Sequence, residues 1–123
     1  MADKKPRVLV VDDSDYSRHV LCKVLQDNGM EVVGSTPDWQ EALAVYEKTK
    51  PDVVTFDLIM PNGGGVEGIK ELLLRDPKAR VIVISAVRTG PEMEAAKSLG
   101  IAAFVAKPVK WDELGPAIAN ATK

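Results

Sequence analysis

Five short runs of apolar and β-branched residues recur at regular intervals along the chain, and stretches with helical periodicity separate them. The runs read RVLVV, EVVGS, DVVTF, RVIVIS and AAFVA. Strands that alternate with helices in this way predict βαβ units, which place helices on both faces of a parallel sheet. The first, third and fourth runs are almost continuously apolar, as is typical of central strands buried on both faces. Because βαβ crossovers are right-handed, we expect a doubly wound α/β domain.

The stretches between the apolar runs carry signals for the ends of helices. The first helix is expected over about residues 14–28, and Gly29 directly after it suits a helix C-terminus. The second has Asp38 as a candidate N-cap and stops before Pro51. The third and fourth helices are expected in GVEGIKELLLRD and PEMEAAKSLG. Four helices can therefore be placed from local signals alone.

The last helical stretch, KPVKWDELGPAIANATK, contains Gly115 and Pro116 where its middle should be. A proline inside a regular helix removes a backbone donor and clashes with the preceding turn, at a cost of roughly 3 kcal/mol. Two outcomes are open. Either the helix kinks, or it begins again with Pro116 as its first residue.

A chain of 123 residues with 46% hydrophobic and 28% charged residues has the size and composition of one folded domain, expected here over residues 1–123. Its net charge of −2 lacks the basic excess typical of direct nucleic-acid binding. No apolar stretch is long enough to span a bilayer, and the opening MADKKPR lacks the apolar segment of a secretion signal. A single cysteine, Cys22, cannot form an internal disulfide, which fits a reducing compartment. We therefore expect a cytoplasmic protein that binds neither nucleic acid nor membrane directly.

Polar and charged residues follow or end four of the five predicted strands. Asp12 and Asp13 follow the first, Asp57 ends the third, Ser85 ends the fourth and Lys107 follows the fifth. In an open parallel sheet, ligands bind beyond the carboxyl ends of the strands. The sequence therefore predicts that three carboxylates, one hydroxyl and one ammonium meet at the same edge of the sheet.

The charges of these residues limit what the cluster can be. Two like charges about 4 Å apart repel by on the order of 4 kcal/mol at an effective dielectric constant near 20. One lysine does not offset three acids, so either a carboxylate takes up a proton or a divalent cation binds among them. Oxygen ligands with open positions suit Mg²⁺. Taken singly, a strand-end acid is often a helix N-cap, and Asp13 or Ser14 could cap the first helix.

The motifs VLVVDDS, PDVVTFDLIMP, VIVISA and FVAKPV, in this order and spacing, resemble those of response-regulator receiver domains, most closely the stand-alone chemotaxis (CheY-like) type. The resemblance covers essentially the whole chain. It implies a flavodoxin-like five-stranded sheet with the order 2-1-3-4-5. It also implies that residues 1–123 are a single receiver domain without an output domain.

The resemblance assigns roles to the residues at the sheet edge. Asp57 would be the nucleophile that takes a phosphoryl group from the phosphohistidine of a partner kinase. Asp13, Asp57 and the backbone carbonyl of Ile59 would bind Mg²⁺ directly, and Asp12 would act through a bound water. Lys107 would pair with the phosphoryl oxygens. Such chemistry is consistent with phosphoryl transfer, which depends mostly on positioning and charge neutralisation.

The resemblance also implies a switch. The hydroxyl of Ser85 would move to the phosphoryl group, and Phe104 on the fifth strand would then turn inward. The face formed by the fourth helix, fifth strand and fifth helix would pass the signal on. The peptide bond before Pro108 is expected to be cis, as is typical of the family.

The partners implied by the resemblance are a CheA-like sensor histidine kinase and a downstream protein such as a flagellar motor switch. The protein would be a monomer that can pair when phosphorylated, and it would catalyse only its own phosphorylation and dephosphorylation. The alternatives are a phosphorelay intermediate and a receiver domain excised from a larger transcriptional regulator. A phosphatase of the haloacid dehalogenase type needs a second acid two residues after the nucleophile, where this chain has Ile59.

Besides Gly115 and Pro116 in the last helix, two features depart from the usual receiver pattern. Gly63, Gly64 and Gly65 stand in succession after Asp57, and we expect them to make this loop mobile. Trp39 replaces a glycine that the family usually has before the second helix.

Overall fold

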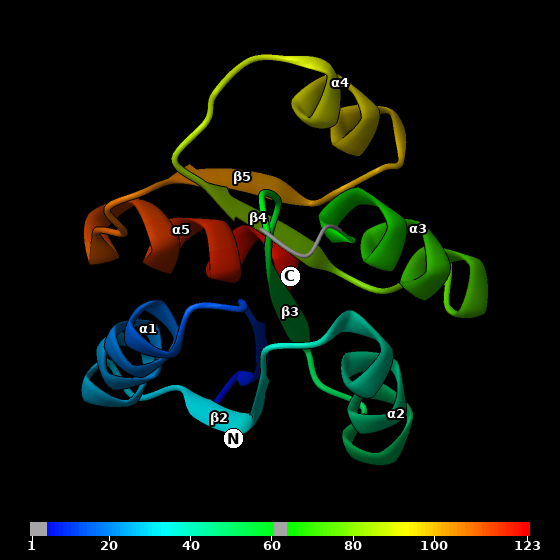
Figure 1. Cartoon of the computed structure of the whole chain (residues 1–123). Coiled ribbons are helices and arrows are strands. Elements are labelled where there is room, and N and C mark those ends of the chain that lie inside the picture. Colours follow the sequence, from blue (N-terminus) through cyan, green and yellow to red (C-terminus); the bar gives the residue numbers. More distant parts are fainter. Residues whose placement is uncertain (1–4, 61–63) are drawn as a thin grey trace.

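The computed structural model of the chain describes residues 5–60 and 64–123. Within them, five parallel strands form one sheet in the order β2-β1-β3-β4-β5 (Figure 1). Every neighbouring pair of strands is parallel. The strands are β1 (Arg7–Val11), β2 (Glu31–Thr36), β3 (Val53–Asp57), β4 (Val81–Ser85) and β5 (Ala103–Ala106). The predicted fold class and strand order are confirmed.

Helices cover both faces of this sheet (Figure 1). One face packs against α1 and α5, and the other packs against α2, α3 and α4. None of the helices in the described part of the chain has both the length and the apolar character needed to cross a bilayer. The helices are α1 (Asp15–Asp27), α2 (Trp39–Thr49), α3 (Gly65–Arg75), α4 (Pro91–Ser98) and α5 (Trp111–Ala121).

The three strands predicted to be central are buried along almost their entire length. Every residue of β3 and β4 is buried, and in β1 only Arg7 is partly exposed. Successive side chains point to opposite faces, so Val53 joins the core under α1 and α5 while Val54 joins the core under α2, α3 and α4. Because both faces are covered, every position on these strands favours an apolar side chain.

The N-termini of the first two helices follow the local capping signals. The Ser14 hydroxyl accepts a hydrogen bond from the Ser17 backbone N–H at 3.2 Å, so Ser14 rather than Asp13 caps α1. The Asp38 carboxylate accepts from the Gln40 backbone N–H at 2.9 Å and caps α2, as predicted.

The structure excludes one of the two outcomes expected for the last helix. α5 runs without interruption from Trp111 to Ala121 and contains Pro116 as its sixth residue, so the prediction that a helix begins at Pro116 is wrong. A Cβ added to Gly115 would lie 2.9 Å from Cε2 of Trp111. Gly115 therefore leaves room for the indole ring to lie against its own helix.

The glycine-rich segment after β3 is described in part. Gly63 lies outside the described residues, so its predicted mobility remains an expectation. Gly64 has a φ of +98° and immediately precedes α3, and Gly65 is the first residue of that helix. Only glycine adopts this left-handed conformation without strain, which explains Gly64 at the start of α3.

Candidate functional site

The three predicted acids lie together at the carboxyl edge of the sheet. Strands β1 and β3 are neighbours with Val11 opposite Phe56, so Asp12 and Asp57 follow at the same level. One carboxylate oxygen from each of Asp12, Asp13 and Asp57 lies within 4.8 Å of the others. Asp12 and Asp57 are buried, with exposed fractions of 3% and 6%, and Asp13 is half-buried. The predicted convergence of these carboxylates is therefore present in the structure.

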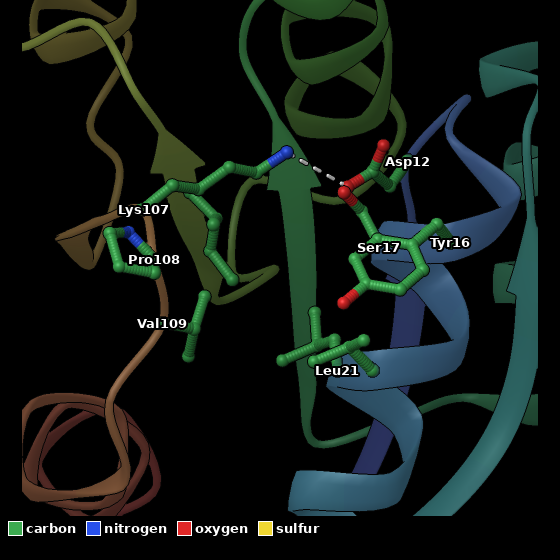
Figure 2. A pocket seen from close by; sticks show the side chains of 9 residues that line it. Asp12, Tyr16, Ser17, Leu21, Lys107, Pro108 and Val109 are labelled. Carbon is green, nitrogen blue, oxygen red and sulfur yellow. Dashed lines mark hydrogen bonds and ion pairs between the residues drawn. The ribbon is translucent and has the colours of Figure 1, made fainter.

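Lys107 reaches this acidic cluster from the far side of β4. Its Nζ donates hydrogen bonds to Asp12 Oδ2 at 3.1 Å and to Asp57 Oδ2 at 3.2 Å. Figure 2 shows the Lys107 side chain extended toward Asp12 across the end of the sheet. The peptide bond between Lys107 and Pro108 is cis, as predicted. One ammonium group thus bridges two buried carboxylates.

Burial and neighbouring charges shift the pKa values of Asp57 and Lys107. Burial raises the pKa of Asp57 from 3.8 to about 6, the Lys107 ammonium opposes the rise and the Asp12 carboxylate adds to it. Burial alone would lower the pKa of Lys107, but the charges of Asp57 and Asp12 and its hydrogen bonds to them raise it above its ordinary value. At neutral pH the site therefore holds an ionised Asp57 beside a protonated Lys107.

Ser85 and Ile59 lie beside Asp57 but make different contacts. Ser85 ends β4 and is fully buried, and its Oγ accepts a hydrogen bond from the Val87 backbone N–H at 3.0 Å. The Ile59 backbone N–H donates to Asp57 Oδ1 at 3.3 Å, while the Ile59 side chain is 40% exposed. The roles of the Ser85 hydroxyl at a phosphoryl group and of the Ile59 carbonyl at a metal stay predictions.

Phe104, the other predicted switch residue, lies on β5 opposite Val83 of β4. It is half-buried and packs against the core under α2, α3 and α4. This is an intermediate position for an aromatic ring, between full burial and exposure. Its predicted inward turn stays a prediction.

Arg18 is a contact of the site that the sequence patterns did not reveal. Its Nη1 donates to the backbone carbonyl of Asp12 at 2.7 Å, and its Nη2 pairs closely with Asp15. The Asp12 carboxylate also accepts from the Ser14 backbone N–H at 2.9 Å. These bonds hold the turn between β1 and α1, which carries two of the acids. The spacing from Asp12 to Arg18 places the arginine on the second turn of α1, but only its side-chain conformation shows that it reaches back.

A cavity of about 220 Å³ opens beside the ion pair, between α1 and the segment after β5 (Figure 2). Its walls are mostly apolar and include Val20, Leu21 and Val109. At its border Tyr16 is 78% exposed and Val20 is 40% exposed. Asp12 and Lys107 line the same cavity, so the charged pair is reachable from this side.

The chemistry of the cluster fits a divalent metal. Its ligand atoms are all oxygens, from three carboxylates within reach of one another. A single ammonium balances only one of the three negative charges, and a hard divalent cation would balance the rest. The arrangement is suited to hold a cation and a phosphoryl group side by side, because Lys107 borders the same carboxylates.

Fold and site together define a class of protein: doubly wound α/β domains that gather acids and one lysine beyond the carboxyl ends of the strands. The chain belongs to the response regulator receiver domain family, whose family model matches residues 8–119. It is 35% identical over 117 residues to the chemotaxis protein CheY of Thermotoga maritima, and the match covers 95% of this chain and 98% of that protein. The resemblance drawn from the motifs is thereby confirmed.

Solved structures of the family share this fold. The response regulator domain of Thermotoga maritima CheB superimposes with a TM-score of 0.85 at 34% identity, and the match covers 97% of each chain. The CheX–CheY–BeF₃–Mg²⁺ complex of Borrelia burgdorferi contains a chain with a TM-score of 0.86 at 26% identity, covering 95% of this chain and 89% of that one. The chain is therefore a receiver domain of response regulators in both sequence and fold.

Proposed function

We propose that this receiver domain accepts a phosphoryl group on Asp57 from the phosphohistidine of a sensor kinase, in a Mg²⁺-dependent reaction. The observation that carries the proposal is the position of the Asp57 carboxylate, 3.2 Å from the Lys107 ammonium and within 4.8 Å of oxygens of Asp12 and Asp13. A buried carboxylate with a pKa of about 6 is ionised at neutral pH and can act as a nucleophile.

The transfer would proceed as an in-line displacement. A carboxylate oxygen of Asp57 forms a bond to phosphorus, and the phosphorus–nitrogen bond of the donor histidine breaks, with its electron pair returning to the imidazole ring. Lys107 then donates hydrogen bonds to phosphoryl oxygens, where negative charge accumulates. Asp13, Asp57 and the Ile59 carbonyl would hold Mg²⁺ directly, and Asp12 through a water. When bound, Mg²⁺ supplies the remaining charge neutralisation.

Phosphorylation would change the contacts of Ser85. Its hydroxyl accepts from the Val87 N–H, which ties it to the segment between β4 and α4. If the hydroxyl moves to donate to the new phosphoryl group, it would leave the Val87 N–H, release that segment and make room for Phe104 to turn toward the site. The face of α4, β5 and α5 would then differ between the two states.

We infer a chemotaxis or motility role from the match to the CheY of Thermotoga maritima along nearly the full length of both chains. The partners would be a CheA-like kinase and a flagellar motor switch, met in the cytoplasm, with no direct binding to nucleic acid or membrane. Residues 1–123 would be one domain that signals by binding alone and catalyses only its own phosphorylation and dephosphorylation. The unphosphorylated protein would be a monomer, and the phosphorylated form could pair through its output face.

A receiver domain that serves within a longer regulator is the second candidate. The match to the response regulator domain of CheB, at 34% identity, favours this alternative over a phosphorelay intermediate. Both candidates use the same chemistry at Asp57, so they differ in the partner and not in the site.

The switch can be tested with beryllofluoride, which mimics a phosphoryl group on a carboxylate. We expect that Mg²⁺ and beryllofluoride together shift the backbone amide NMR signals of Ser85, Val87 and Phe104. With Mg²⁺ already present, adding beryllofluoride should leave the spectrum of Asp57→Asn unchanged. Unshifted signals in the unmodified protein, or equal shifts in Asp57→Asn, would contradict the proposed switch.

A further inference from the structure

Trp39, one of the departures from the usual receiver pattern, lies against two glycines of the region where α3 begins. It is the first residue of α2, directly after the N-cap Asp38. A Cβ added to Gly64 would lie 2.5 Å from Trp39 Nε1, and one added to Gly68 would lie 2.6 Å from Trp39 Cβ and 2.9 Å from its Cγ. No ordinary side chain fits at either position while the indole stays in place. The two glycines therefore form a groove that the tryptophan fills.

The first turn of α3 also lies directly on the backbone next to Asp57, the proposed phosphoacceptor. A Cβ added to Gly65 would lie 2.7 Å from the carbonyl carbon of Leu58 and 3.0 Å from the carbonyl oxygen of Asp57. The Leu58 backbone N–H donates to the Ile84 carbonyl at 3.2 Å, which aligns this stretch with β4. The backbone of Asp57 and Leu58 is thus held between β4 on one side and the start of α3 on the other.

These contacts form a continuous path from α2 to the site. The indole of Trp39 touches Gly64 and Gly68, and Gly65 between them touches the backbone of Asp57 and Leu58. Trp39 is itself half-buried and packs against the core under α2, α3 and α4. A side chain held by α2 therefore limits how far the first turn of α3 can move away from Asp57.

We propose that Trp39 is a positioning residue for the metal site. It keeps the first turn of α3 pressed on the backbone of Asp57 and Leu58, and so keeps the Asp57 carboxylate and the adjoining Ile59 carbonyl placed for a divalent cation. The proposal rests on the proposed function, because it takes Mg²⁺ as the cation and Ile59 as one of its ligands. Trp39 itself touches neither.

The chain offers a matched control for Trp39. Trp111 is also half-buried and is also the first residue of its helix, where it packs against Gly115 of that helix. It belongs to the core on the opposite face, under α1 and α5. Replacing either tryptophan removes a similar side chain, but only Trp39 lies on the path to Asp57.

The first readout is the dissociation constant of Mg²⁺, measured by isothermal titration calorimetry on unphosphorylated protein at pH 7.5. We expect Trp39→Ala to weaken Mg²⁺ binding by about three- to tenfold, at or below the low end for loss of a direct partner of a metal ligand, because Trp39 acts through α3. Trp39→Phe, which keeps a ring in the groove, should restore most of the affinity. Trp111→Ala should bind Mg²⁺ as the unmodified protein does.

The second readout uses no metal. In the metal-free protein, Trp39→Ala should speed hydrogen exchange at the Leu58 amide, which bonds to Ile84, and Trp111→Ala should not. Circular dichroism first shows whether each variant is folded. If Trp39→Ala does not fold, Trp39→Leu replaces it, because a leucine keeps apolar contact but not the reach of the indole.

The outcomes separate this inference from the proposed function. If the unmodified protein binds Mg²⁺ and Trp39→Ala binds it equally well, Trp39 is not a positioning residue and the proposed function stands. The same holds if Trp111→Ala weakens binding as much as Trp39→Ala does. If the unmodified protein does not bind Mg²⁺, both the inference and the proposed metal site are overturned.

Discussion

Asp57 is a buried carboxylate that the folded chain places beside a second buried carboxylate, Asp12, and a single ammonium, Lys107. Burial above all raises its pKa from 3.8 to about 6. An acid with a higher pKa in the folded state holds its proton more tightly there than in the unfolded chain. The free energy of unfolding therefore falls as the pH rises from 3.8 to about 6, and the loss is complete above that range.

Replacing this carboxylate by an amide should stabilise the protein. Without divalent cations at pH 7.5, we expect Asp57→Asn to raise the free energy of unfolding by about 1–3 kcal/mol, since the buried charge is removed. At pH 5.0 the gain should be smaller, because Asp57 is then largely protonated in the folded protein. Urea denaturation at the two pH values measures both quantities. A gain that is absent at pH 7.5, or equal at both pH values, would contradict the raised pKa.

Some features of the site could be predicted from the sequence, and others could not. Asp12, Asp57 and Lys107 follow from the rule that the carboxyl ends of parallel strands share one edge of the sheet. The bond from Arg18 to the Asp12 carbonyl could not be predicted, because it depends on the conformation of a long side chain. The fit of Trp39 against Gly64 was equally hidden, since it joins two segments that meet only in the folded chain.

The strands and most helices could be read from the sequence because their local signals agree with their burial. Strands β3 and β4 are covered on both faces, so their apolar character does not depend on register. In α5 the local signals conflict with burial. Leu114 and Ile118 are fully buried against the sheet, and their packing offsets the cost of Pro116 inside the helix. Helix propensity alone does not show whether the packing or the cost of the proline is larger.

Replacing Pro116 should therefore stabilise the protein. Its side chain is exposed, and as a proline it cannot donate to the Asp112 carbonyl one turn earlier. We expect Pro116→Ala to raise the free energy of unfolding by about 1–3 kcal/mol, measured by urea denaturation.

Gly115→Ala is the matched control for this prediction. Alanine is more favourable than glycine in a helix by about 1 kcal/mol. The new methyl group at position 115, however, would meet the indole of Trp111. We therefore expect no gain in stability from Gly115→Ala. A greater gain from Gly115→Ala than from Pro116→Ala would show that the proline does not limit α5.

At the scale of the whole molecule, one sheet separates two hydrophobic cores, and the site lies at the edge that both cores support. Asp12, Asp57 and Lys107 come from the ends of β1, β3 and β5, with β4 between the last two. The cluster therefore forms only when β1, β3, β4 and β5 have come together. The folded domain holds three acids close together, and the proposed phosphoacceptor site with a bound cation would give this costly arrangement a use.

The most direct measurement is the intact mass of the protein after incubation with acetyl phosphate, with and without Mg²⁺, beside Asp57→Asn under the same conditions. We expect the mass to increase by one phosphoryl group, only when Mg²⁺ is present, and not at all in Asp57→Asn. An equal increase in Asp57→Asn would show that another residue is the phosphoacceptor. An equal increase without Mg²⁺ would contradict the role of the acidic cluster as a metal site.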